Sequence, residues 1–85
     1  MLDVREPVEW DIVHMPNARL IPRGELPERI HELDTADEIV VYCKTGARSA
    51  AALAFMRQAG FRKVKNLRGG IDAWAREIDP SMPRY

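Results

Sequence analysis

The feature that most constrains the fold is a short apolar run near the middle of the chain. Residues 38–42 read Glu-Ile-Val-Val-Tyr, and the aliphatic residues of this run are all β-branched. Such a run is typical of a strand that is buried on both faces of a parallel sheet. Because both faces of that strand need cover, the rest of the chain must supply helices to both sides of the sheet. The run ends at Cys43, the only cysteine of the chain.

Strand-like and helix-like segments alternate on either side of this run. The expected strands are 2–4, 18–21, 38–42 and 63–67, and the expected helices are 6–13, 25–33, 50–59 and 71–78. This alternation predicts an α/β fold in which a mostly parallel central sheet lies between two layers of helices. All of residues 1–85 are expected to form one domain, because a chain of this length has room for only one small core. The tail, residues 79–85, contains two prolines and is expected to be extended.

Charge and cysteine content limit the classes of function. Thirteen basic and thirteen acidic residues cancel, so no net field favours nucleic acid or a membrane as a partner. No apolar segment approaches the roughly 20 residues that a membrane-spanning helix needs, and the N-terminus lacks the pattern of a signal peptide. A single cysteine excludes an internal disulfide. We therefore expect a cytoplasmic location, where a lone thiol stays reduced.

The segment after the central strand has the composition of an anion-binding loop. Ligands of α/β folds bind at the carboxyl ends of the strands, which is where Cys43 is expected. The polar residues 44–48 lead into the next helix, for which Ser49 is the expected N-cap. Backbone N–H groups of the loop and the helix N-terminus would converge on the thiol, and Lys44 and Arg48 would add positive charge. Such surroundings predict a thiol that ionises more easily than free cysteine and is reachable from solvent.

The candidate site is therefore a nucleophilic Cys43 with an anion-binding loop. The loop residues are Lys44, Thr45, Gly46, Ala47, Arg48 and Ser49. Gly46 permits a backbone conformation that a side chain would obstruct, and the hydroxyl groups of Thr45 and Ser49 would donate to a bound anion. A lone cysteine after a strand is by default a small buried apolar residue, and only the basic loop favours a nucleophile here. Cys43, His14 and His31 lack the spacing of a zinc site, and we expect neither a metal nor an organic cofactor.

The loop Cys43–Ser49 resembles the active-site loop of the rhodanese family, and three other segments agree with this. Asp3-Val4-Arg5-Glu6 is similar to the opening strand of that family. His14-Met15-Pro16-Asn17-Ala18 resembles its Gly-His-Ile-Pro-Gly-Ala turn, with Val13 and Asn17 where glycines are usual. Asn66-Leu67-Arg68-Gly69-Gly70, followed by Trp74, resembles its closing segment. The four motifs occur in the expected order, and together they cover residues 3–74.

This resemblance implies a rhodanese-like three-layer α/β/α fold, with its opening strand missing from the chain. It also implies a thiosulfate-sulfurtransferase class of enzyme, in which Cys43 carries sulfane sulfur as a persulfide. Asp3 and Arg5 are expected to form a supporting pair beneath the loop. The sulfur donor would be thiosulfate or a cysteine desulfurase. The chain has no second cysteine to resolve a mixed disulfide, so that thiol would come from another domain, a partner or a small molecule.

Residues 74–85 resemble the C-terminus of the MoeZ-type adenylyltransferase/sulfurtransferases. In those proteins an adenylating domain precedes a C-terminal rhodanese domain. The resemblance implies that the chain is the C-terminal part of a larger protein, covalently linked to an adenylyltransferase domain upstream. It further implies that Cys43 supplies sulfur to the activated C-terminus of a small ubiquitin-like sulfur-carrier protein. The product would be a thiocarboxylate, used for example in molybdopterin biosynthesis.

Three alternatives remain open. A general thiosulfate sulfurtransferase would use the same residues with a different acceptor. A cysteine-based phosphatase needs five residues between its cysteine and its arginine, whereas Cys43 and Arg48 are separated by four. A non-catalytic rhodanese-like binding module would usually lack the cysteine.

Overall fold

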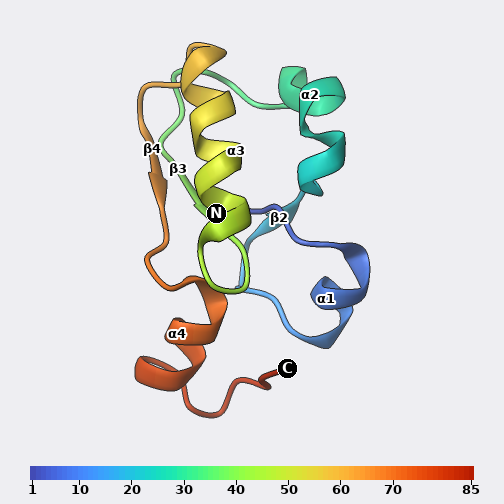
Figure 1. Cartoon of the computed structure of the whole chain (residues 1–85), viewed down its shortest axis with the longest axis vertical. Coiled ribbons are helices and arrows are strands. Elements are labelled where there is room, and N and C mark those ends of the chain that lie inside the picture. The colour runs from blue at the N-terminus through green and yellow to red at the C-terminus, as the bar shows by residue number, and fades with distance from the viewer.

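The central apolar run forms an inner strand of a parallel sheet, as predicted. In a computed structural model of residues 1–85, this strand is β3 (Ile39–Tyr42). The other strands are β1 (Leu2–Asp3), β2 (Arg19–Leu20) and β4 (Val64–Asn66). The order in the sheet is β2-β1-β3-β4, and all pairs are parallel (Figure 1). Val41 lies opposite Leu2 on one side and Asn66 on the other, so β3 has a neighbour along both edges.

Helices cover both faces of the sheet, which confirms the predicted three-layer architecture. The helices are α1 (Pro7–Ile12), α2 (Leu26–Arg29), α3 (Ala47–Gln58) and α4 (Gly70–Glu77). On one face, Leu26 of α2 and Met56 of α3 join Val41 in the main core. On the other face, Ile71 of α4 packs with Tyr42 in a smaller cluster. The carboxyl end of β3 therefore lies between two cores.

The predicted helix 25–33 is less regular than expected. Short 3₁₀ turns, Arg23–Glu25 and Ile30–Glu32, flank the four residues of α2. The predicted apolar face is nevertheless present, because Leu26 is buried and Ile30 and Leu33 pack against the main core. Apolar residues three apart also lie on one face of a 3₁₀ turn, so the periodicity alone does not separate the two geometries.

The prediction that Ser49 caps a helix starting at residue 50 is wrong. Helix α3 begins at Ala47, and its N-cap is Gly46, whose φ of 116° lies in the left-handed region. An N-cap residue has a non-helical backbone conformation, whereas Ser49 lies inside the first turn of α3. A glycine adopts the conformation of Gly46 without the steric cost that a Cβ would bring. The loop after Cys43 is consequently shorter than the sequence suggested.

The tail after α4 is not simply extended. The N–H and hydroxyl groups of Ser81 bind the Asp79 carboxylate, at 3.2 and 2.5 Å, and form a turn. Met82 packs against the smaller core cluster. The final residue, Tyr85, then lies against the side chain of Arg5. No helix has the length and apolar character needed to cross a membrane.

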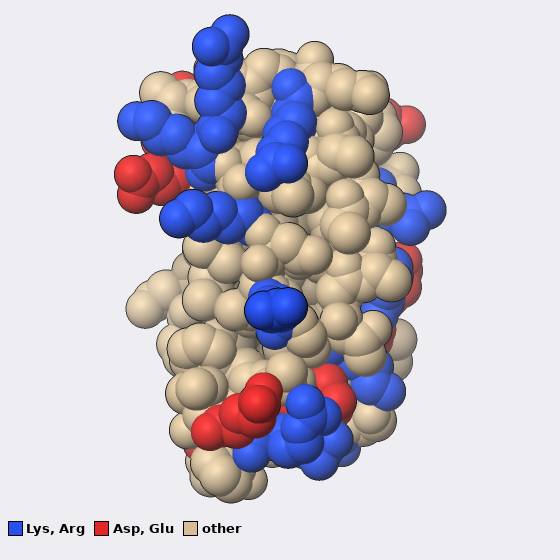
Figure 2. Space-filling view, turned by 60° about the vertical axis from the view of Figure 1, so that its left-hand side comes forward, with Lys and Arg blue, Asp and Glu red and all other residues tan.

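Strand β4 is an edge strand, in agreement with its alternating sequence. Figure 2 shows Lys and Arg side chains gathered on the side of the molecule where β4 runs. Among them, Arg62, Lys63 and Lys65 are exposed and line one shallow depression. Charged side chains, lysine especially, hinder pairing of an edge with a foreign strand.

Gly70 allows α4 to pack directly on the backbone that follows β3. The N–H of Ile71 donates to the Cys43 carbonyl at 2.9 Å, and the N–H of Asp72 donates to the Lys44 carbonyl at 3.0 Å. Gly70 has a φ of 65°, and a Cβ there would lie 2.4 Å from the Lys44 carbonyl oxygen. The first turn of α4 thus fixes the start of the loop from behind.

We predict that Gly70→Ala lowers the free energy of unfolding by about 2–4 kcal/mol, because the new Cβ meets backbone atoms at a left-handed position. Urea unfolding followed by circular dichroism measures this change. Gly24→Ala is the matched control, since a Cβ at Gly24 would meet no atom within 4 Å. Equal stability of the two variants would contradict the close packing of α4 on the loop.

Candidate active site at the Cys43 loop

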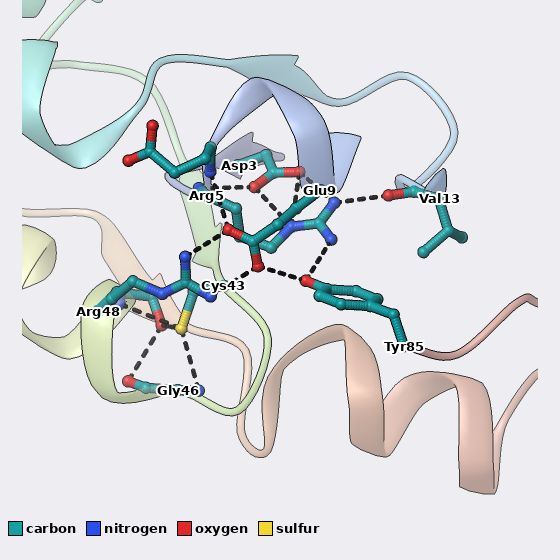
Figure 3. A network of polar contacts seen from close by, with 10 residues as sticks. Asp3, Arg5, Glu9, Val13, Cys43, Gly46, Arg48 and Tyr85 are labelled. Atoms are coloured by element: carbon teal, nitrogen blue, oxygen red, sulfur yellow. Dashed lines mark hydrogen bonds and ion pairs between the residues drawn. The ribbon is translucent and has the colours of Figure 1, made fainter. Parts of the chain in front are cut away.

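The sulfur of Cys43 lies in a ring of hydrogen-bond donors. The N–H of Gly46 donates to Sγ at 3.1 Å, and the N–H of Ser49 donates at 3.3 Å. The Ser49 hydroxyl lies 3.3 Å from the same sulfur. Ser49 belongs to the first turn of α3, where backbone N–H groups have no partner within the helix. The short loop therefore directs the free donors of the helix N-terminus at one atom (Figure 3).

Asn66, at the carboxyl end of β4, holds this loop in place. Its side-chain N–H donates to the Gly46 carbonyl at 3.2 Å, and its Oδ1 accepts a hydrogen bond from the Ser49 hydroxyl at 2.6 Å. The Ser49 hydroxyl therefore has both the sulfur and Asn66 within reach. Asn66 lies in one of the four family motifs, but no role for its side chain follows from the sequence. Its position at the end of the neighbouring strand is the only signal that could have indicated one.

Two opposing effects act on the pKa of the Cys43 thiol. Burial is the strongest single influence and acts to raise the pKa. Hydrogen bonds from the Ser49 hydroxyl and from the N–H groups of Ser49, Gly46 and Thr45 act in the other direction. Together they bring the pKa of Cys43 below the ordinary value of a thiol, because each donor stabilises the thiolate. The arrangement therefore favours an ionised sulfur.

The expectation that this sulfur is freely reachable from solvent is wrong for this conformation. Cys43 is only 1% exposed. The physical reason is the tightness of the loop: Gly46 and Ser49 approach the sulfur closely enough to hydrogen-bond it, and so they also cover it. The contacts that favour the thiolate are the contacts that shield it.

Arg48 is engaged by a carboxylate that the sequence did not suggest. Its guanidinium forms a two-pronged ion pair with Glu9 of α1, with N–O distances of 2.5 and 2.8 Å. This pairing lowers the pKa of Glu9 to about 2, against an opposing effect of burial. Glu9 also accepts a hydrogen bond from the Glu6 N–H at 3.0 Å, which completes a capping box at the start of α1. The Glu-x-x-Glu spacing indicates the helix start, but nothing in it identifies Arg48 as a partner.

Asp3 and Arg5 form a fully buried ion pair, with both side chains 0% exposed. The Arg5 guanidinium contacts the Asp3 carboxylate at 2.7 to 3.1 Å through Nε and Nη2. Its remaining hydrogen bonds reach the Val13 carbonyl at 2.6 Å and the Tyr85 hydroxyl at 2.7 Å. A buried ion pair needs such additional hydrogen bonds to offset desolvation. The pair thus ties β1 to the C-terminal residue.

Tyr85 connects the two ion pairs. Its hydroxyl accepts the hydrogen bond from Arg5 and donates one to the Glu9 carboxylate at 2.6 Å (Figure 3). The Lys44 ammonium group lies 4.5 Å from the centre of the Tyr85 ring, within the range of a cation–π contact. Contacts between residues this far apart in the chain leave no trace in local periodicity, which is why the sequence indicated neither Glu9 nor Tyr85.

The remaining candidate residues have minor roles in the site. Thr45 and Ala47 are exposed, and Thr45 contributes its backbone N–H to the sulfur rather than its hydroxyl. His14 stacks on Trp10 at 3.7 Å between ring centres, and its Nδ1 lies 2.9 Å from the Trp10 carbonyl. No group of three potential ligands could hold a metal ion.

Comparison with known proteins places this geometry in a family. A profile described as "Rhodanese-like domain" matches residues 1–77. The adenylyltransferase/sulfurtransferase MoeZ of Mycobacterium tuberculosis is 48% identical over 87 residues, covering all of this chain but only 22% of MoeZ. A sulfurtransferase of Allochromatium vinosum is 42% identical over 76 residues, covering 89% of this chain and 71% of that protein.

A solved structure shows the same fold. The crystal structure of a rhodanese-related protein from Thermoplasma volcanium matches with a TM-score of 0.86 and 39% identity, over 91% of this chain and 76% of the other. The family match includes all four strands, the Cys43 loop and the whole of α4. The chain therefore belongs to the rhodanese-like domain family.

Proposed function

We propose that this domain is a sulfurtransferase that carries sulfane sulfur as a persulfide on Cys43. The observation that carries the proposal is the convergence of the Gly46 and Ser49 N–H groups on one sulfur atom with a lowered pKa. In the loading step, the thiolate attacks the outer sulfur of a donor. A new S–S bond forms to Cys43, the S–S bond of the donor breaks, and the leaving group departs with that electron pair.

The same donors suit the product of this step. A persulfide places its negative charge on the outer sulfur, and the loop offers N–H groups and Lys44 to an anion in that region. Because the sulfur of Cys43 is covered in the resting conformation, loading requires the loop around Gly46 to open. Gly46 has a positive φ, and a Cβ there would make only ordinary van der Waals contact with the Gly69 nitrogen, at 3.9 Å.

The short loop supports sulfur rather than phosphate as the transferred group. Only Lys44, Thr45 and Gly46 lie between Cys43 and the start of α3. The donors of this loop lie close to the cysteine sulfur, and a loop this short has fewer N–H groups with which to surround a tetrahedral phosphate than a loop one residue longer. Sulfur transfer is therefore favoured over the phosphatase alternative.

We propose further that the acceptor is the adenylated C-terminus of a small ubiquitin-like sulfur-carrier protein. The similarity to MoeZ, whose name joins the two activities, supports this acceptor and an adenylyltransferase domain upstream in the whole protein. The persulfide sulfur attacks the acyl-adenylate carbonyl and releases AMP, which leaves an acyl disulfide on Cys43. A second thiol then cleaves the S–S bond, forms a disulfide with Cys43 and releases the thiocarboxylate. That thiol comes from outside this chain, whose only cysteine is Cys43.

We predict that treatment with thiosulfate or a hydropersulfide adds the mass of one sulfur atom to the chain. Cys43→Ser should show no gain, since no other thiol is present. Intact-protein mass spectrometry, before and after a reducing agent, checks both statements. A gain that persists in Cys43→Ser, or no gain with any donor, would contradict the proposed function.

We predict that Ser49→Ala slows sulfur loading about tenfold at neutral pH, because the sulfur loses the nearby hydroxyl dipole and Asn66 loses the donor that ties it to the loop. The thiol pKa rises in the variant, so the deficit narrows as the pH increases and vanishes once both proteins are fully thiolate. Loading rates across a pH series measure this. Ser81→Ala removes an exposed hydroxyl that donates to Asp79 and not to the loop, and it should match the wild type. A pH-independent deficit in Ser49→Ala would contradict thiolate stabilisation.

A further inference from the structure

The charged groups around Cys43 cancel almost completely. Arg5 is paired with Asp3 and Arg48 is paired with Glu9. Lys44 is then the one cation of the site without a carboxylate partner, and it matches the single negative charge of a Cys43 thiolate. The site is therefore balanced for one negative charge, whereas a rhodanese loop with a free arginine would carry a surplus of positive charge.

We propose that Glu9 is a specificity-determining residue, which neutralises Arg48 and makes the site select neutral or singly charged persulfide donors over dianions such as thiosulfate. This inference rests on the proposed sulfur transfer and names the class of donor that it uses. The donor is recognised by its charge, and its chemical class is a hydropersulfide, free or attached to a protein.

Arg48 lies near enough to Cys43 for the charges of the two side chains to interact. Figure 3 shows its guanidinium beside Cys43, and the charge of Cys43 contributes to the raised pKa of Arg48. Both terminal nitrogens of Arg48 nevertheless bond to the two oxygens of Glu9. A dianion that used Arg48 would have to displace a two-pronged carboxylate, which is the strongest arrangement for such a pair.

Glu9 is held by several donors, and its lowered pKa keeps it ionised at neutral pH. It accepts hydrogen bonds from the Glu6 N–H at 3.0 Å and from the Tyr85 hydroxyl at 2.6 Å, in addition to those from Arg48. Its side chain is only 14% exposed. Because Glu9 has donors on three sides, withdrawing it from Arg48 would break contacts to α1 and to the C-terminal residue together.

Thiosulfate and a hydropersulfide both give the Cys43 persulfide, but they release leaving groups of different charge. With thiosulfate, the thiolate takes the outer sulfur and sulfite leaves as a dianion. With a hydropersulfide, the thiolate takes the outer sulfur and a thiolate leaves with one negative charge. Both reactions form Cys43 persulfide, so they differ in the charge that the site must accept. Unmatched charge is costly beside a buried sulfur, where solvent screens it poorly.

The test is Glu9→Gln, which removes the charge but keeps the size of the side chain and an oxygen for the Glu6 N–H. Loading rates are measured with thiosulfate, a dianion, and with the hydropersulfide of β-mercaptoethanol, which carries at most one negative charge. We expect kcat/KM for thiosulfate to rise at least about tenfold, mainly through KM, because Arg48 becomes free to bind a dianion. The rate with the hydropersulfide should change less than about threefold. Asp11→Asn removes a charge from the exposed side of α1, away from Arg48, and should alter neither rate.

An unchanged or lower thiosulfate rate in Glu9→Gln, with the hydropersulfide rate retained, would overturn the proposal while leaving sulfur transfer intact. Failure of both donors to load the wild type would remove the proposed function as well. Salt dependence of the wild type tests the same idea without a variant. A balanced site predicts a thiosulfate rate that does not fall as ionic strength rises, and a falling rate would show an attractive site and contradict the proposal.

Discussion

The hydrogen bonds from Gly46 and Ser49 to the sulfur of Cys43 are the contacts on which the rest of the site depends. They exist because only four residues, Cys43 to Gly46, separate the end of β3 from the start of α3. The left-handed Gly46 turns the chain sharply enough to point the free N–H groups of α3 back at the strand end. Asn66 binds the carbonyl of Gly46 from the side, and α4 binds the carbonyl of Cys43 from behind. Every layer of the fold thus contributes to the position of one sulfur atom.

A network of ion pairs and hydrogen bonds lies beside this sulfur and influences which anions can approach it. Asp3, Arg5, Tyr85, Glu9 and Arg48 are connected by successive hydrogen bonds from the centre of the sheet to the loop. Such buried pairs contribute little net stability, because desolvation opposes their attraction. Their effect is to fix geometry and to cancel charge, which leaves the backbone N–H groups as the principal donors to an anion. Anion binding at the site is therefore expected to depend more on the dipoles of backbone N–H groups than on unpaired cationic side chains.

The sequence predicted the parts of this arrangement that depend on local order. The apolar run indicated β3, the alternation of elements indicated the parallel sheet, and the loop composition indicated the position of Cys43. Three side chains at the site, Asn66, Glu9 and Tyr85, could not be assigned roles in this way. Ser49 and Asn66 are 17 residues apart, Arg48 and Glu9 are 39 apart, and Tyr85 and Glu9 are 76 apart. The packing of the helices determines which of these groups pair with each other. The helix start at Ala47 could not be predicted because a glycine N-cap has no side chain to identify it, whereas the hydroxyl of Ser49 is typical of an N-cap residue.

The role proposed for Cys43 depends on the donors around its sulfur, which lower the pKa of the buried thiol. The most direct test of this effect is a pH titration of the thiolate by ultraviolet absorbance, with Cys43→Ser subtracted as the baseline. The account predicts a single transition centred below the value for free cysteine, about 8.5, because the donors outweigh burial. A transition at or above that value would mean that the effect of burial on the thiol pKa outweighs that of the donors. Cys43 would then be a buried, unreactive thiol and not a nucleophile.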